Sequence, residues 1–169
     1  NLYPEVIAYS GKRWPVPARD VDKAKKLLAD AGWTKNSEGV LSKNGNPFEI
    51  ELVLSEDAVA GSRKLGEVLQ YMLGEAGIVM SLRNVDHAAR HGEIPKFKYD
   101  LSLFMSNGAP YDPFNTITMM FPTEKKPGTD GKMYESKELD PLIWAAARAD
   151  EPDRVRKFQK VWDWLYENH

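Results

Sequence analysis

The chain has 169 residues, of which 42% are hydrophobic, so it is long and apolar enough for one domain with a buried core. Its net charge of −2 offers no basic field, and we therefore expect no nucleic-acid partner. The absence of cysteine excludes disulfides, cysteine-ligated zinc and thiol catalysis. The apolar runs are only a few residues long, too short to cross a bilayer.

Both ends of the sequence look cut. The chain begins at Asn1 with no charged and apolar leader before it. It stops inside a helical pattern that contains Trp164 and Leu165. We therefore expect residues 1–169 to be a single domain excised from a longer protein.

The first elements are predicted from turn and capping residues. Residues 14–17 are expected to be extended because two prolines disfavour helix there. Asp20 predicts the cap of a helix that ends at Gly32. The dipeptide Asn44-Gly45 predicts a tight turn, and alternating apolar residues then predict a hairpin leading into a core strand. The inward residues are Val21, Ala24, Leu27, Leu28 and Ala31 of the helix and Phe48, Ile50, Leu52 and Leu54 of the strand.

A second helix and two further strands are predicted next. The helix ends at Gly77, and a strand, a short helix or turn over 86–93 and a strand over 99–105 follow it. This order predicts an α/β fold in which helices flank a mixed sheet. The helix is expected to face the core with Leu65, Val68, Leu69, Met72, Leu73 and Ala76, and the next strand with Ile78, Met80 and Leu82.

The rest of the chain is predicted to be helical. A short helix is expected to begin at Asp112-Pro113, a loop to occupy 122–133, and two helices to begin near Asp140-Pro141 and Pro152. Asp112 and Asp140 are both interpreted as helix caps. The predicted inward residues of the last two helices are Leu142, Ile143, Trp144 and Ala146, then Val155, Phe158, Val161, Trp162 and Leu165.

Few residues suggest catalysis. His87 and His91 would share a helical face close to Glu93, a spacing that could hold a metal ion. The helical zinc-protease motif is absent, however, and a solvated helix explains the pair better. No nucleophile elbow, phosphate loop or dinucleotide motif is present. We therefore expect neither enzyme activity nor a cofactor, and we keep a metal-dependent hydrolase using these three residues as an alternative.

A glycine- and proline-containing segment is the candidate ligand site. It follows a predicted strand and leads into a helix N-terminus, a place where α/β proteins bind ligands and where anions are favoured. A stiff structural turn would explain the same composition, so the residues alone leave both readings open. The segment consists of Asn107, Gly108, Ala109, Pro110, Tyr111 and Asp112.

Four stretches resemble one protein family. Residues 108–113, Gly-Ala-Pro-Tyr-Asp-Pro, resemble a hallmark of the bacterial family 5 extracellular solute-binding proteins, the peptide- and nickel-binding receptors of ABC importers. Residues 20–33 resemble the family's helix ending in Ala-Gly-Trp, and residues 69–79 resemble its next helix and strand. Residues 134–143, followed by Asp150 and Arg154, resemble its closing helices.

The resemblance implies a receptor of two lobes that encloses its ligand. This chain would be most of the C-terminal lobe, of a type 2 periplasmic-binding-protein-like fold, and the first lobe would be missing. The parent protein would be an exported, periplasmic or extracellular, membrane-associated monomer that delivers its ligand to an ABC permease.

The resemblance also bears on the ligand. Ala109 stands where peptide receptors often place an aspartate that binds the peptide's amine, and the full run is closer to the nickel-chelate branch, in which Tyr111 would face the ligand. Asn107, Phe114 and Lys125 replace aromatic or histidine residues of that branch, so we expect no metal ligand in this lobe. Peptides and nickel chelates both remain candidates, and an interaction module without a small ligand is a further alternative.

Overall fold

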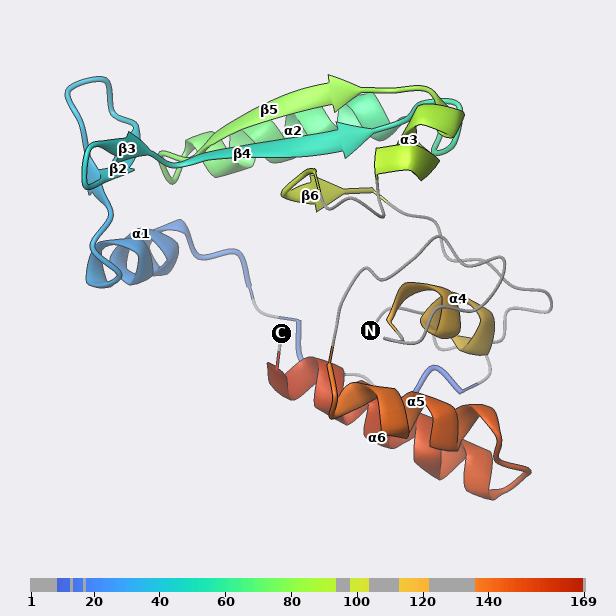
Figure 1. Ribbon diagram of the computed structural model, residues 1–169. Helices are drawn as coiled ribbons and strands as arrows, with labels where there is room; N and C mark the ends of the chain where they lie inside the picture. Colours follow the sequence, from blue (N-terminus) through green and yellow to red (C-terminus); the bar gives the residue numbers. More distant parts are fainter. Residues whose placement is uncertain are drawn as a thin grey trace. The chain divides into compact units, whose positions relative to one another are not determined.

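The computed structural model describes residues 9–12, 14–16, 18–93, 98–103, 113–121 and 136–168 (Figure 1). The chain divides into two compact units, one formed by Asn1–Val16 with Ser106–His169 and the other by Pro17–Met105. We call them unit 1 and unit 2 and describe each by itself. Over the described residues, none of the helices has the length and apolarity needed to cross a membrane.

Unit 2 begins with helix α1, Val21–Asp30. The Asp20 side chain accepts a hydrogen bond from the Lys23 backbone N–H at 2.8 Å, so Asp20 is the predicted N-cap. Gly32 adopts a left-handed φ of +89° just after the helix, where a residue with a side chain would be strained. None of the α1 residues is buried, and its predicted inward face is therefore only partly covered.

A small antiparallel sheet follows, with strands β1 (Thr34–Lys35), β2 (Leu41–Lys43) and β3 (Asn46–Pro47) in that order. Asn44 and Gly45 have φ values of 53° and 80°, as a two-residue hairpin turn with both central residues left-handed requires. The Trp33 and Phe48 rings stack at 4.3 Å between centroids and fix the hairpin to the end of α1. The predicted hairpin is confirmed.

A parallel sheet forms the centre of unit 2. Its strands β4 (Glu49–Leu54), β5 (Val79–Asn84) and β6 (Leu101–Ser102) have the order β5-β4-β6. Helix α2, Ser62–Gly74, lies along one face of β4 and β5 (Figure 1). Leu52, Leu54 and Met80 are the buried core of this layer. The predicted α/β fold is confirmed, and in the described residues the parallel and antiparallel strands occupy separate sheets.

Two details of unit 2 differ from the sequence prediction. The strand expected over 99–105 is a strand at Leu101–Ser102, and residues 104–105 lie outside the described part. Leu65, Val68 and Met72 of α2 are exposed, although helical spacing predicted that they face the core. The core is reached by Leu69 and Leu73, because α2 contacts the sheet through a narrow face.

Unit 1 contains helices α4 (Pro113–Met120), α5 (Leu139–Ala147) and α6 (Asp153–Asn168). Figure 1 shows α5 and α6 lying side by side. The buried core of this unit consists of Ile117, Leu139, Ile143, Ala146, Phe158, Val161 and Trp162. The predicted loop over 122–133 lies outside the described residues.

Three predictions for unit 1 were wrong in part. Trp144 is half-buried and Val155 is exposed, although both were expected in the core. Asp140 is the second residue of α5 and not its cap. The Ser136 hydroxyl oxygen instead accepts hydrogen bonds from the backbone N–H groups of Glu138 and Leu139, at 3.3 and 3.0 Å.

Candidate functional site

The carboxyl ends of β4 and β5 meet at one edge of the parallel sheet because the strands run in the same direction. The Val85 N–H donates to the Leu54 carbonyl at 3.0 Å, so the loops that leave the two strands begin side by side. Ligands of open α/β sheets bind beyond this edge. The polar groups that follow β4 and β5 lie at this edge.

Asp57 ties the loop after β4 to the helix after β5. Its Oδ1 accepts the hydroxyl hydrogen of the buried Ser55 at 2.6 Å, and its Oδ2 accepts the backbone N–H of His87 at 3.1 Å. These two bonds, first the one from Ser55 and then the one from His87, lower the pKa of the Asp57 carboxyl. The Asp57 carboxylate thus fixes the backbone at His87, where the next helix begins.

Helix α3, His87–Glu93, is set at the same edge. Asp86 caps it by accepting the Ala89 backbone N–H at 2.7 Å. The side chain of Arg90 is buried, and its Nη2 donates to the Leu103 carbonyl at 2.8 Å. Leu103 follows β6 directly, so Arg90 fixes the chain shortly before residue 107. Burial raises the pKa of nearby Tyr99, and the charge of Arg90 acts in the opposite direction.

The predicted ligand segment itself, Asn107, Gly108, Ala109, Pro110, Tyr111 and Asp112, lies outside the described residues. The nearest described residues are Leu103 before it and Pro113 after it. Leu103 is held by Arg90 in unit 2, and the fully buried Pro113 begins α4 in unit 1. These two residues are therefore each held within their own unit.

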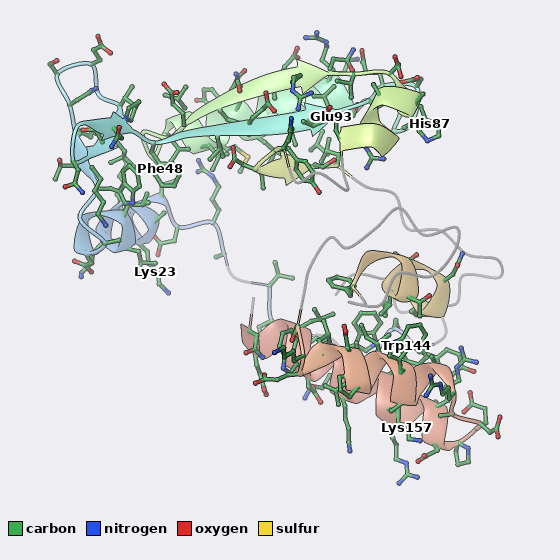
Figure 2. All side chains as sticks on the ribbon, in the orientation of Figure 1. Lys23, Phe48, His87, Glu93, Trp144 and Lys157 are labelled. Atoms are coloured by element: carbon green, nitrogen blue, oxygen red, sulfur yellow. The ribbon has the colours of Figure 1, made fainter. Side chains whose placement is uncertain are left out.

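The arrangement around α3 does not support the hydrolase alternative. Figure 2 shows His87 at the start of the helix and Glu93 at its end. Glu93 is paired with Arg83 at 3.1 Å, and Arg83 also pairs with Glu51 at 2.9 Å. The two carboxylates raise the pKa of Arg83, with Glu51 the larger influence. The His91 side chain is outside the described part, within which no three His, Asp or Glu groups are placed to hold a metal ion.

Unit 1 has a groove of about 640 Å³ on α5 and α6. The guanidinium carbon of Arg148 lies 5.8 Å from the centre of the Trp144 ring, within reach of a cation–π interaction. Basic side chains outnumber the single carboxylate in the lining, so the groove suits an anionic group better than a metal ion. The lining residues are Lys137, Asp140, Pro141, Trp144, Ala145, Arg148 and Lys157.

Sequence reasoning missed Ser55, Asp57 and Arg90 as residues that shape the site. The available signal was their position, because Ser55 and Asp57 come directly after a buried strand. The partner of Arg90 is a carbonyl 13 residues away, and no local pattern predicts that contact.

Comparison with known proteins identifies the family. The sequence profile of the bacterial extracellular solute-binding proteins, family 5 (middle), matches residues 1–128. The chain belongs to this family. A nickel-binding periplasmic protein of Escherichia coli is 31% identical over 122 residues, which are 71% of this chain and 23% of that protein. Members of the family are extracellular solute-binding proteins.

Solved structures extend the similarity to nearly the whole chain. An ABC transporter substrate-binding protein from Sinorhizobium meliloti is 43% identical with a TM-score of 0.78, over 95% of this chain and 32% of that one. The oligopeptide-binding protein AppA of Bacillus subtilis, solved with a nonapeptide, is 22% identical with a TM-score of 0.73, over 98% of this chain and 32% of that one, and shows the shared fold alone. The chain thus spans about a third of the length of these two solved proteins.

Proposed function

We propose that the chain is part of a ligand-binding lobe of an extracellular receptor that delivers peptides or nickel chelates to an ABC permease. The observation that carries the proposal is the similarity to the Sinorhizobium substrate-binding protein over 95% of this chain. The Escherichia coli relative favours nickel as cargo, and the sequence resemblance keeps peptides as the second candidate ligand. No feature of the described residues favours an enzyme or a module without a small ligand.

The proposed contact segment is 107–112. Gly108 and Ala109 leave the backbone open to close approach, and Tyr111 offers a ring face and a hydroxyl group. The anchoring of Leu103 by Arg90 supports this assignment, because a ligand-contacting segment needs a rigid support. No side chain of this segment is assigned to a metal, so a nickel ion would arrive held by its own chelator.

We extend the proposal to the organisation and partners of the whole receptor. Residues 1–169, both units together, would belong to the C-terminal lobe, and the first lobe would close over the ligand from the other side. The receptor would act as a periplasmic or extracellular, membrane-associated monomer. Its partners would be the ligand, its own first lobe and the ABC permease.

The test is a pair of substitutions at Tyr111 in the full receptor. We expect Tyr111→Ala to weaken ligand binding about tenfold or more, because it removes both the ring and the hydroxyl group. Tyr111→Phe keeps the ring and should lose less. Isothermal titration with nickel–histidine and with short peptides measures the affinity and also identifies the ligand class.

Thermal unfolding of both variants is the control. The melting temperature should stay close to that of the unchanged receptor if Tyr111 faces the ligand. An unchanged ligand affinity in Tyr111→Ala, at an unchanged melting temperature, would remove this segment from the binding site.

A further inference from the structure

Unit 2 has an apolar groove of about 400 Å³ between α1 and α2. Its lining is almost entirely hydrocarbon, and the polar groups at its rim include Arg19, which pairs with Glu75. The groove is lined by Arg19, Asp20, Val21, Ala24, Leu28, Leu69, Met72, Leu73, Ala76, Ile78 and Leu101.

An exposed apolar stripe on α2 continues the groove. Leu65, Val68 and Met72 follow helical spacing and are 48%, 53% and 38% exposed. Met72 belongs to both the stripe and the groove lining. We call the groove and the stripe together the α1–α2 face. Adjoining apolar side chains left exposed on a protein surface favour a contact with another segment.

We propose that the α1–α2 face is covered by the part of the receptor polypeptide that lies outside this chain. The proposal rests on the proposed function, since it takes the chain to be a piece of a larger receptor. The chain spans 32% of the Sinorhizobium protein, so about two thirds of such a receptor is available as the occupant. A segment of the same polypeptide is held at high effective concentration and needs no separate binding partner.

The chemistry of the face favours this occupant over the alternatives. Permanent interfaces are more apolar than transient ones, and a permease contact that forms and breaks in each transport cycle would require more polar residues. A ligand that must be released would also need polar groups to orient it, and the groove lining offers few. We therefore assign the face to an apolar segment that stays in place.

These 169 residues contain no cysteine, so an introduced thiol is unique within the chain, and in the full receptor its labelling is followed by mass spectrometry of the peptide that carries it. Val68→Cys and Met72→Cys are made singly, both in the 169-residue chain and in the full receptor, and the rate of maleimide labelling is measured. We expect both thiols to react at least tenfold more slowly in the full receptor than in the chain. Glu67→Cys is the matched control, because it is exposed and adjacent residues on a helix point about 100° apart.

Three outcomes would overturn the proposal. Equal labelling rates in the two proteins would mean that the face stays open to solvent in the receptor. Slow labelling of the monomeric chain would mean that segments of the chain itself cover the face. Slow labelling that appears only when the chain forms dimers on a sizing column would assign the face to a second copy.

Ligand titration of the same full-receptor variants separates this inference from the proposed function. If the variants bind ligand and their thiols are labelled rapidly, only the proposal that the α1–α2 face is covered is contradicted. If the thiols are protected but no ligand binds, only the proposed ligands are contradicted. Val68→Glu adds an independent measurement. It should lower the melting temperature of the full receptor and leave that of the isolated chain nearly unchanged, since Val68 is exposed there.

Discussion

At the scale of single residues, two glycines of α2 show how position decides the effect of a side chain. A Cβ at Gly66 would lie 3.1 to 3.3 Å from the methyl groups of Leu82, Leu54 and Leu52. A Cβ at Gly74 would meet no atom within 4 Å. Gly66 thus lets the helix approach the sheet closely, whereas Gly74 has no packing role.

These two positions predict opposite changes in stability. Gly66→Leu should lower the free energy of unfolding of unit 2 by about 1–3 kcal/mol, because the added side chain overpacks the helix–sheet contact. Gly74→Ala should raise it by up to about 1 kcal/mol, because alanine favours helix. Hydrogen exchange of the β4 and β5 amides reports on unit 2 alone. If the β4 and β5 amides of the Gly66→Leu protein exchange as slowly as those of the original, the close packing of α2 against the sheet is contradicted.

Local signals at this scale were readable from sequence when the interaction was itself local. Asp20 caps α1 through a bond to Lys23, three residues away, and Asn44-Gly45 forms its turn without any distant partner. Asp140 was misassigned, because the helix begins at Leu139 and the Ser136 hydroxyl oxygen accepts the Leu139 backbone N–H. A serine and an aspartate four residues apart compete for the same role, and the backbone path decides between them.

At the scale of elements, α3 joins the loop after β4 to the end of β6. Asp57 holds the N-terminus of α3, and Arg90 from its middle holds the carbonyl of Leu103. Hydrogen bonds therefore link three segments at the carboxyl edge of the sheet: the loop after β4, helix α3 and the end of β6.

Removing the Arg90 anchor should weaken both stability and binding. Arg90→Met keeps most of the buried stem but loses the bond to Leu103, and we expect a loss of about 1.5–3 kcal/mol in unfolding free energy. In the full receptor, ligand affinity should fall as the segment after Leu103 loses its support. Urea unfolding and isothermal titration measure the two effects.

Arg63→Ala is the control for this prediction. Arg63 is half-exposed, with its nearest carboxylates at 3.8 and 3.9 Å, so its loss should change little. Equal effects of the two substitutions would show that Arg90 contributes no more than a surface charge.

Helical spacing predicted the helices well and their buried faces less well. In α6, Phe158, Val161 and Trp162 are buried as expected, whereas Val155 is exposed. In α2, the apolar residues form two stripes, and the sheet covers only the one with Leu69 and Leu73. Periodicity identifies apolar positions, but the neighbouring element selects which of them are buried.

At the scale of the whole molecule, the chain is a third of the length of its solved relatives and divides into two compact units. A pocket shared between two lobes gains its affinity when the lobes close, so a single lobe should bind ligand weakly. Ligand affinity is thus expected to belong to the receptor as a whole.

A thermal-shift titration tests this expectation. Ligand binding stabilises a protein by RT ln(1 + [L]/Kd), about 2.7 kcal/mol at a hundredfold excess over Kd. At a concentration of nickel–histidine or peptide that gives this stabilisation in the full receptor, the 169-residue chain should show almost no shift. A saturable shift of equal size in the chain would mean that this lobe alone holds the site.

The sequence by itself determined the order of helices and strands, the turn at Asn44-Gly45, the cap at Asp20 and the family. Each depends on residues close together in the chain or on a run such as 108–113. Only the tertiary structure decided the β5-β4-β6 order, the exposed stripe on α2, and the hydrogen bonds that His87 donates to Asp57 and Arg90 donates to Leu103. The two hydrogen bonds join residues that are 30 and 13 positions apart in the sequence. The energy of such contacts depends on how the segments pack in space, which no local pattern encodes.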